Sequence, residues 1–195
     1  MHKIILIPGL GDETKYTRFG TRWWKMRGLD VVVFPVGWQD GDRHFAPKFQ
    51  RMLELVDEMV KNGDTVSLIG LSAGGSAVLN VFAARKNVIH RVITIGARNR
   101  VGTYTGANSF ENRTHTSPAF AESIEQAEKI EKKFSVEDRK KIMTIRPIYD
   151  EVVPARTAVI QGAKNMMFPT VEHVNSIMSA LTIYSKVIIS FLQTD

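Results

Sequence analysis

The chain contains 195 residues, 44% of them hydrophobic, and its 26 basic and 20 acidic residues leave a formal net charge of +6. This size predicts one domain over residues 1–195 with one sizeable core. The chain has no cysteine, which excludes disulfides, thiolate metal sites and a cysteine nucleophile, and we expect a cytoplasmic protein. No apolar stretch approaches the length of a membrane span.

The chain begins with a short apolar run over residues 4–7, directly after Lys3. A basic residue before an apolar run is also typical of a signal peptide. This run is too short for one, lacks a small-residue cleavage site and ends in a turn at Pro8 and Gly9. It therefore predicts the first strand of the fold.

Six apolar, mostly β-branched runs alternate with helical patterns along the chain. The predicted strands cover residues 4–7, 31–36, 66–69, 92–95, 142–146 and 166–171. The predicted helices cover residues 14–27, 45–61, 73–85, 118–134, 155–162 and 174–192. Strands that are apolar on both faces and separated by helices predict a mostly parallel sheet covered on both sides. The predicted fold class is therefore α/β, with three layers in the order α/β/α.

This alternation is interrupted between residues 97 and 141. The segment begins with a polar loop rich in Asn, Thr, Gly and Arg, and the predicted helix over residues 118–134 follows it. Long insertions between strands often carry functional residues. We expect a small cap-like insertion over the functional edge of the sheet.

Basic residues gather in residues 85–100 and 129–141. Such clusters can bind an anionic partner or a membrane surface. In the second cluster acidic residues alternate with basic ones, which favours an ordinary solvated helix face. No nucleic-acid recognition motif is present, and we expect no nucleic-acid partner.

The most informative motif is Gly70-Leu71-Ser72-Ala73-Gly74-Gly75, which lies between an apolar run and a helical pattern. A serine between glycines at a strand-to-helix turn is typical of a nucleophile in a serine hydrolase. Such a turn strains the serine backbone, and its neighbours must be small. Because the pattern also arises by chance, the alternative is a glycine-rich turn without a catalytic role.

A nucleophilic serine needs a base, and the base needs an orienting carboxylate. His173 is the only histidine after residue 115, and it follows the predicted strand over residues 166–171. Ligands and catalytic groups of open α/β sheets gather at the carboxyl ends of the strands. We therefore predict that His173 is the base. The alternative is a histidine at a helix start without a role, and His115 is the other histidine that could reach a substrate.

The acid is expected after the preceding strand, where the chain reads Tyr149-Asp150-Glu151-Val152-Val153-Pro154. This segment resembles the acid loop of the α/β-hydrolase family, which commonly reads D-x-x-V-P. The resemblance implies Asp150 rather than Glu151 as the acid. The alternative is a turn that Asp150 initiates before a helix.

The loop Pro8-Gly9-Leu10-Gly11-Asp12 resembles the oxyanion loop of the same family. The resemblance implies that the backbone N–H groups of Leu10 and Ala73 would stabilise the oxyanion. A strand, Gly9-x-Gly11 and a helix also begin a dinucleotide-binding unit. Here Thr14 replaces the third glycine and Asp30 precedes its strand, so we expect no nucleotide, no metal and no other cofactor.

The chain departs from the family at two positions beside the predicted catalytic residues. Glu172 precedes His173 where the family often has glycine, and Tyr149 precedes Asp150 where glycine is also common. These residues bear on the geometry of the two loops. They leave open a second interpretation, in which the chain is a catalytically idle hydrolase scaffold that acts as a binding protein.

The resemblance spans essentially the whole chain and implies a small serine hydrolase, similar to carboxylesterases, that cleaves a small acyl ester through an acyl-enzyme. A thioesterase or peptidase would use the same residues. Candidate substrate-binding residues are Tyr16, Trp38, Arg98 and Val152, and Arg98 could bind a substrate carboxylate. Tyr16, Phe19 and Trp23 also have helical spacing, which predicts a stripe that faces the core.

Overall fold

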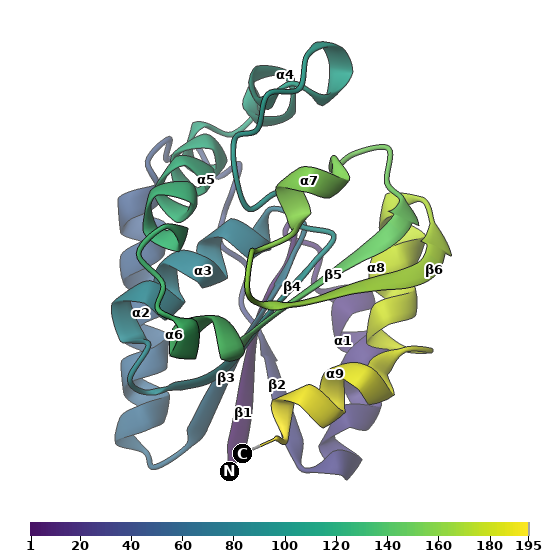
Figure 1. Cartoon of the computed structure of the whole chain (residues 1–195). Helices are drawn as coiled ribbons and strands as arrows, with labels where there is room; N and C mark the ends of the chain where they lie inside the picture. The colour runs from purple at the N-terminus through teal and green to yellow at the C-terminus, as the bar shows by residue number, and fades with distance from the viewer. Residues whose placement is uncertain (195) are drawn as a thin grey trace.

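The computed structural model describes residues 1–194, so Asp195, the last residue of the predicted domain, lies outside the described residues. Six strands form one sheet in the order β2-β1-β3-β4-β5-β6, and every neighbouring pair is parallel. Helices cover both faces of the sheet (Figure 1), which confirms the predicted three-layer α/β class. The strands are β1 (His2–Ile7), β2 (Leu29–Val33), β3 (Thr65–Leu71), β4 (Ile89–Ile95), β5 (Ile142–Tyr149) and β6 (Lys164–Val171).

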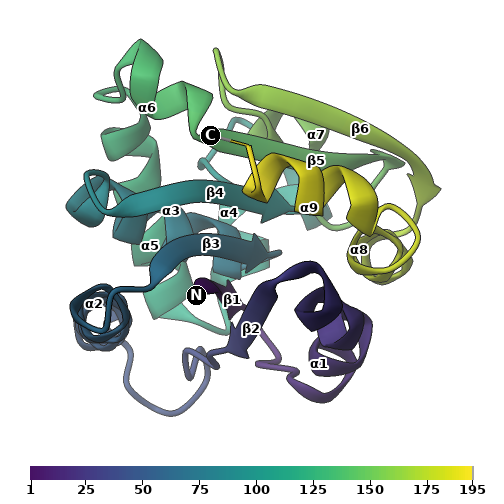
Figure 2. The same cartoon turned by 90° about the horizontal axis from the view of Figure 1, so that it is seen from below.

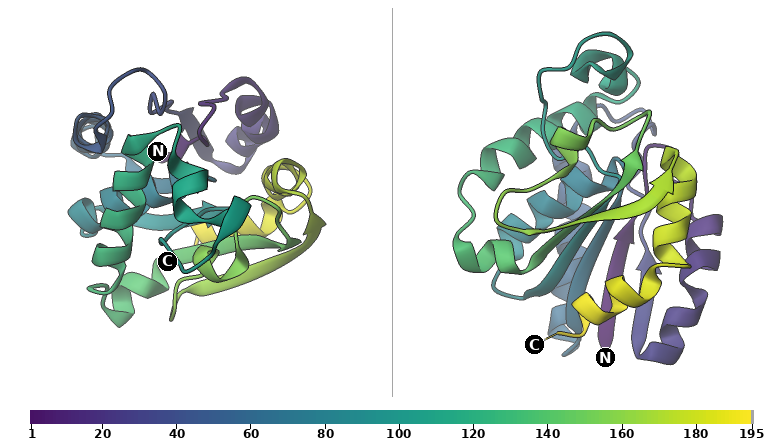
Figure 3. Two further views of the ribbon diagram at one scale, coloured as in Figure 1. Left: turned by 90° about the horizontal axis from the view of Figure 1, so that it is seen from above. Right: turned by 45° about the vertical axis from the view of Figure 1, so that its right-hand side comes forward.

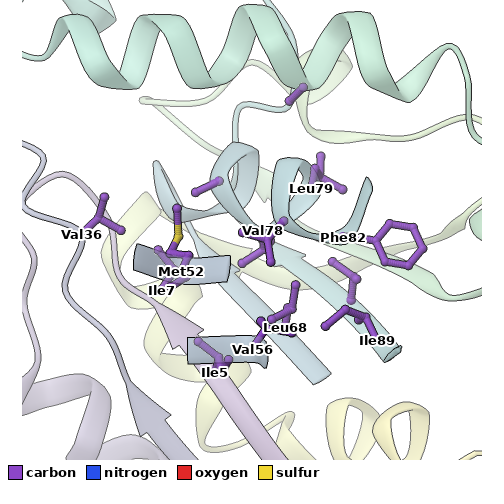
Figure 4. Close-up of a cluster of buried hydrophobic side chains, with 14 of the residues drawn as sticks. Ile5, Ile7, Val36, Met52, Val56, Leu68, Val78, Leu79, Phe82 and Ile89 are labelled. Atoms are coloured by element: carbon purple, nitrogen blue, oxygen red, sulfur yellow. The ribbon is translucent and has the colours of Figure 1, made fainter. Parts of the chain in front are cut away.

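One face of the sheet carries α2 (Phe45–Lys61), α3 (Gly74–Arg85), α5 (Pro118–Glu131) and the short α6 (Val136–Lys140). Their apolar faces meet the sheet in a core whose members include Ile5, Val56, Leu68, Val78 and Phe82 (Figure 4). Each of these five side chains is at most 1% exposed. This layer holds β3 and α3 in place, and the turn between them carries Ser72.

The opposite face carries α1 (Lys15–Thr21), the 3-10 helix η1 (Arg22–Arg27), α8 (His173–Leu181) and α9 (Ser185–Leu192). Figure 2 shows α1, α8 and α9 together on this side of the sheet. The sequence predicted one terminal helix over residues 174–192, but the helix breaks at residues 182–184. Thr182 leaves the helical conformation there, and the Tyr184 ring packs on Phe168 with the centroids 4.7 Å apart.

Within residues 1–194, no single helix has both the length and the apolar composition needed to cross a membrane. The pair α8 and α9 meets those two criteria jointly, but the two helices are bent by 57° at the break between them.

The segment between residues 97 and 141 does not lie over the site as a whole. α5 packs against α3 in the layer on the sheet face, where the hydroxyls of Ser76 and Ser123 are 2.6 Å apart and the Asn80 amide donates to the Ser123 carbonyl. Only the loop with η2 (Gly106–Asn108) and α4 (Phe110–Thr114) rises above the sheet edge (Figures 1 and 3). The segment therefore supplies the crossover helix between β4 and β5, and only its first part projects as an insertion.

The helix predicted over residues 155–162 is shorter in the structure. α7 covers Ala155–Ala158, and Val159 is extended. The carbonyls of Ala158 and Val159 accept hydrogen bonds from the side chains of Asn99 and Arg100. The Asn99 amide thus takes the Ala158 carbonyl, which the N–H of residue 162 would use in a longer helix.

The predicted core-facing stripe of α1 is wrong. Tyr16, Phe19 and Trp23 are 63%, 57% and 61% exposed. The buried side of α1 is formed by the small residues Thr17, Gly20 and Thr21, and the buried residue of η1 is Trp24. A Cβ on Gly20 would lie only 3.3 Å from Met178 and 3.4 Å from Leu181. The small residues let α1 approach α8 closely, and the same helical spacing then turns the large aromatic residues outward.

His2 is the first residue of β1 and is partly buried. Its Nε2 lies 2.9 Å from the Ser67 hydroxyl, and its ring meets the His90 ring edge-on at 5.4 Å. Burial, His90 and the N-terminal ammonium lower the pKa of His2 from 6.5 to about 4. Burial also lowers the pKa of His90.

We expect the fold to lose stability through His2 as the pH falls from 6.5 to about 4. Over this interval the ring is protonated in the unfolded chain and neutral in the folded one, so protonation favours unfolding. The loss should be about 1–2 kcal/mol, since the partly exposed ring is screened by solvent. Urea unfolding near neutral pH and at low pH measures it. His2→Gln, whose amide can keep the contact with Ser67, should reduce the pH dependence; an unchanged pH dependence would contradict this assignment.

Candidate active site

Ser72 sits in the turn between β3 and α3, and its φ is +50°. The positions around it must be glycine, because a Cβ there would clash with neighbouring atoms. A Cβ on Gly70 would lie 2.3 Å from the Gly74 carbonyl oxygen, and a Cβ on Gly74 would lie 2.3 Å from the Ile7 carbonyl oxygen. A Cβ on Gly75 would lie 2.2 Å from that of Ala97. The tight packing of strand and helix thus holds the serine in a conformation that side chains rarely adopt.

His173 and Asp150 lie beside this serine, although 101 and 78 positions, respectively, separate them from it in the sequence. His173 Nε2 is 2.9 Å from Ser72 Oγ. His173 Nδ1 is 2.9 Å from Asp150 Oδ2 and 3.1 Å from Oδ1. The side chains of His173 and Asp150 are 8% and 6% exposed. The three residues that the sequence singled out therefore form one continuous hydrogen-bonded chain.

The Asp150 carboxylate is held in its ionised form. Burial by itself would raise the pKa of Asp150, but the hydrogen bond and charge of His173 and the N–H groups of Val153 and Val152 lower it below its ordinary value. The two N–H groups donate to Oδ1 at 2.8 and 2.9 Å. Oδ2 remains for the imidazole. An acceptor at Nδ1 favours the tautomer with a proton on Nδ1 and a free lone pair on Nε2.

Two further carboxylates anchor the start of α8, and the sequence reading did not assign them these roles. The Glu151 oxygens accept the backbone N–H of His173 at 3.1 and 3.3 Å. The Glu172 side chain accepts the N–H groups of Val174 and Asn175 at 3.0 and 2.7 Å, and these bonds lower the pKa of Glu172. The signal for Glu172 was an acidic residue directly before a helix, where negative charge is favoured. Glu151 carried no such signal, because it lies 22 residues before His173.

Glu172 has a backbone conformation that favours glycine, with φ +73° and ψ 141°. Such a conformation costs a residue with a side chain about 1–3 kcal/mol. We expect Glu172→Ala to lower the free energy of unfolding by about 1 kcal/mol, because the cap is lost and the strain remains. Glu172→Gly should have a smaller effect because it relieves the strain. Urea unfolding compares the two; an alanine variant more stable than the glycine variant would contradict this account.

The loop after β1 lies directly against the serine. A Cβ on Gly9 would be 3.1 Å from Ser72 Cβ and 3.6 Å from Ser72 Oγ. Within residues 1–194, the N–H groups of Leu10 and Ala73, the predicted oxyanion donors, form no hydrogen bond with the protein. They remain available to a ligand beside Ser72.

Asp12 fastens this loop to the segment after β2. It has a φ of +47°, and its carboxylate accepts three backbone N–H groups: Val36 at 2.7 Å, Gly37 at 2.9 Å and Trp38 at 2.9 Å. These bonds also explain why β2 ends at Val33 and not at residue 36, as the sequence predicted. Sequence reasoning missed this role of Asp12, although an aspartate in a glycine-rich turn is a known sign of side-chain to backbone bonding.

We expect Asp12→Ala to lower the free energy of unfolding by about 2 kcal/mol, because partly buried N–H groups lose their acceptor. The loop beside Ser72 also loses its anchor, and the reaction of Ser72 with a fluorophosphonate probe should slow by about tenfold or more, since small displacements of reacting groups are costly. Urea unfolding and the rate of labelling measure the two effects. An unchanged rate of labelling in a destabilised variant would show that Asp12 serves only the fold.

A cavity of about 490 Å³ opens beside Ser72 and His173, between α1 and α8. Most of its lining is apolar and includes Leu10, Tyr16, Leu71, Val174, Ile177 and Met178. Of the four candidate substrate-binding residues, only Tyr16 contributes to this lining. Such a cavity suits an apolar part of a ligand next to the reactive group.

The other three candidates, Trp38, Val152 and Arg98, lie outside the cavity lining, as does His115, the other histidine considered from the sequence. Trp38 is 2% exposed, stacks on Phe45, and points its indole N–H at the Pro8 carbonyl. Val152 contributes its N–H to Asp150 and does not line the cavity. His115 is exposed on the projecting loop, where its Nδ1 lies 2.7 Å from the Asn112 carbonyl oxygen.

Arg98 is a structural residue and not a surface cation. It is 2% exposed, and its guanidinium donates to four backbone carbonyls, those of Arg100, Val101, Asn108 and Ser109. The planar guanidinium has five N–H donors, which satisfy the carbonyl groups of a loop that turns back on itself. Burial lowers the pKa of Arg98. The predicted contact with a substrate carboxylate is therefore wrong.

Within the described residues, no group of three or more His, Asp or Glu side chains is arranged to hold a metal ion. The site as it stands offers a serine, an imidazole and a carboxylate in sequence, with free N–H groups beside the serine. This arrangement is suited to nucleophilic attack on a carbonyl carbon.

No protein-family model matches the chain, and no curated protein sequence matches it. Solved structures, in contrast, match this chain. Est1E from Butyrivibrio proteoclasticus is 16% identical with a TM-score of 0.66, and the alignment covers 97% of this chain and 88% of that one. The α/β hydrolase MGS-MChE2, from a sediment metagenome of the Mar Chica lagoon in Morocco, is 15% identical with a TM-score of 0.66 and coverages of 98% and 90%.

A meta-cleavage product hydrolase from Pseudomonas fluorescens IP01 is 16% identical with a TM-score of 0.65, and the alignment covers 98% of this chain and 90% of that one. These identities are too low to transfer an activity, but the similarity extends over nearly the whole chain, the parallel sheet and the flanking helices. The protein therefore has the α/β-hydrolase fold.

Proposed function

We propose that this protein is a serine hydrolase that cleaves carboxylic esters by acyl transfer. The observation that carries the proposal is the chain of hydrogen bonds from Ser72 Oγ through His173 to Asp150, with 2.9 Å at each end. An esterase domain and a hydrolase of the same fold are consistent with it. In this proposal Ser72 is the nucleophile, His173 the general base and Asp150 the group that orients the base.

The reaction proceeds in two halves. Ser72 Oγ attacks the ester carbonyl carbon while His173 Nε2 takes the serine proton, and the N–H groups of Leu10 and Ala73 donate to the oxyanion. The intermediate collapses as the alcohol leaves with the proton from Nε2, and the acyl group stays on Ser72. Water then attacks the acyl-enzyme, gives its proton to Nε2, and the acid leaves as Ser72 recovers that proton.

The apolar cavity between α1 and α8 supports an ester with an apolar part, which would lie against Leu10, Ile177 and Met178. Thioesterases and peptidases would use the same catalytic residues. Esters, thioesters and anilides are therefore compared directly as substrates. A series of p-nitrophenyl esters from acetyl to decanoyl, with matched thioester and anilide substrates, measures kcat/KM for each. We expect esters of small acyl groups to be preferred; a preference for the anilide would replace the ester assignment.

A second candidate function is that of a catalytically idle scaffold that only binds a ligand. It was suggested by Glu172, which stands where the family often has glycine. A fluorophosphonate probe separates the two. Labelling of the wild type that disappears in Ser72→Ala and weakens in His173→Ala supports the hydrolase. Absence of labelling in a protein with an intact circular dichroism spectrum would favour the scaffold.

A further inference from the structure

Large apolar side chains on the outer surface of α1 and η1 are exposed to solvent. Tyr16, Phe19, Trp23 and Met26, here called the aromatic face, are 63%, 57%, 61% and 78% exposed. They recur every three or four residues and so lie along one side of the helical segment. Large apolar residues that gather on a surface usually mark an interaction site.

The same segment concentrates the positive charge of the chain. Residues 15–27 contain five basic residues and no acidic one: Lys15, Arg18, Arg22, Lys25 and Arg27. All five are exposed. Outside this segment the basic and acidic residues balance to within one charge, so nearly the whole net charge lies around the aromatic face.

These five cations have no ion-pair partner within residues 1–194. Among the described residues none of them forms an ion pair, whereas Arg85, Lys86, Arg100 and Lys140, from the clusters noted in the sequence, each pair with a carboxylate. Arg85, for example, pairs with Asp57, and Arg100 pairs with Glu131. Five cations without an ion-pair partner in the described part of the chain therefore lie close together on α1 and η1, and residues 15–27 contain no acidic residue.

Two details place cations and aromatic rings together on this surface. The Arg22 guanidinium lies over the Phe19 ring at 4.2 Å and over the Trp23 ring at 4.6 Å. A hollow of about 510 Å³ between η1 and α9 is lined by Trp23, Arg27 and Lys186, among others. Two cations beside an amphipathic ring suit an anionic group that sits at the boundary between water and hydrocarbon.

We propose that α1 and η1 bind an anionic lipid surface, with the aromatic face in the interfacial layer and the basic side chains at the lipid phosphates. Aromatic residues combined with unpaired cations are the combination that interfacial helices use. A second copy of this chain is disfavoured as the occupant, because it would bring two surfaces of the same strong positive charge together.

This surface leads to the cavity beside Ser72. Tyr16 belongs both to the aromatic face and to the cavity lining, and Val174, on α8 across the cavity, is 61% exposed. Figures 2 and 3 show α1 and α8 side by side. Resting on the proposed function, this arrangement names the substrate class: esters of small acyl groups whose apolar alcohol part partitions into the lipid surface, so that they enter the cavity from it.

Binding is tested on vesicles of phosphatidylcholine with and without phosphatidylglycerol. Trp23 is the natural reporter, because Trp24 and Trp38 are each 2% exposed. We expect sedimentation with the anionic vesicles, a blue shift of the tryptophan emission and quenching by brominated lipids, all weakened by salt. Trp23→Ser should abolish the spectral changes.

Charge is tested by reversing two cations. Arg18→Glu combined with Lys25→Glu should weaken partitioning into anionic vesicles about 30-fold or more, at about tenfold per 1.4 kcal/mol and about 1 kcal/mol per basic residue. The matched control is Lys129→Glu with Lys132→Glu, two exposed lysines on the opposite layer of the molecule. The control should bind as the wild type does.

Several results would overturn the proposal: no binding to anionic vesicles at low salt, equal loss of binding in the control, or binding without any change in the Trp23 emission. A dimer that dissociates in Trp23→Ser, without vesicle binding, would assign the surface to a second copy. Binding of a single-stranded oligonucleotide in place of vesicles would assign it to nucleic acid.

The two proposals can fail separately. Ser72→Ala should bind vesicles as the wild type does, because binding does not need the nucleophile. The charge-reversed variant should hydrolyse a dissolved short-chain ester at the wild-type rate and lose at least tenfold in rate only on an ester presented in anionic vesicles. Equal loss on both substrates would overturn the link between this surface and the substrate.

Discussion

Asp150→Asn is expected to lower kcat for ester hydrolysis by about 10⁴-fold. Oδ1 of Asp150 accepts the N–H groups of Val152 and Val153, so the amide oxygen of the variant would occupy that position. Its NH₂ group would then face His173 Nδ1 and donate to it. The proton of the imidazole would move to Nε2, which could no longer accept the proton of Ser72. Steady-state kinetics on p-nitrophenyl acetate near neutral pH measure the loss.

The matched control is Glu151→Gln, which changes the neighbouring carboxylate to an amide in the same way. Glu151 accepts the backbone N–H of His173 and makes no contact with the imidazole ring. An amide oxygen can still accept that N–H, so kcat should stay within about tenfold of the wild type. If Asp150→Asn also remains within tenfold, or if Glu151→Gln has the larger effect, Asp150 is not the orienting acid.

Gly74→Ala is expected to lower the free energy of unfolding by about 3 kcal/mol or more. The new Cβ would lie 2.3 Å from the Ile7 carbonyl oxygen and 2.8 Å from that of Pro8. These contacts are with backbone, which cannot turn aside as a flexible side chain can. To relieve them, α3 would have to move away from β1, and the core around Val78 and Phe82 would open. Urea unfolding followed by circular dichroism measures the change.

Gly11→Ala is the matched control, because a Cβ on Gly11 meets no atom within 4 Å and its φ is not positive. We expect its free energy of unfolding to stay within about 0.5 kcal/mol of the wild type. A Gly74→Ala variant as stable as Gly11→Ala would mean that the turn around Ser72 is far looser than the contacts imply.

Much of the fold can be predicted from local patterns in the sequence. Apolar β-branched runs such as Val66–Ile69 and Val92–Ile95 can satisfy their backbone and bury both faces only in the middle of a covered parallel sheet. The elbow glycines and the order of Ser72, Asp150 and His173 are also local signals, since each follows a strand and the carboxyl ends of parallel strands share one edge. Proximity at 2.9 Å is then a consequence of topology.

The burial of a helix face could not be predicted from the sequence, because it depends on which residues pack against that face in the folded protein. The spacing of Tyr16, Phe19 and Trp23 predicts one side of a helix but not whether that side faces inward. The close approach of α1 to α8 at Gly20 decided this in favour of the small residues. The aromatic residues were thereby left on the surface, where they carry the proposed interaction with lipid.

Strand periodicity and glycine geometry act over a few neighbouring positions, so the α/β layers, the strained turn at Ser72 and the residues near it could be predicted from the chain. The burial of Arg98 among loop carbonyls and the bonds by which Asp12 and Glu151 anchor the site are seen only in the folded molecule. Local patterns mark Asp12 and Glu172 as residues that can bond to backbone N–H groups. The partners of Asp12 and Glu151, the folding of the loop around Arg98 and the positive φ of Glu172 depend on the tertiary structure.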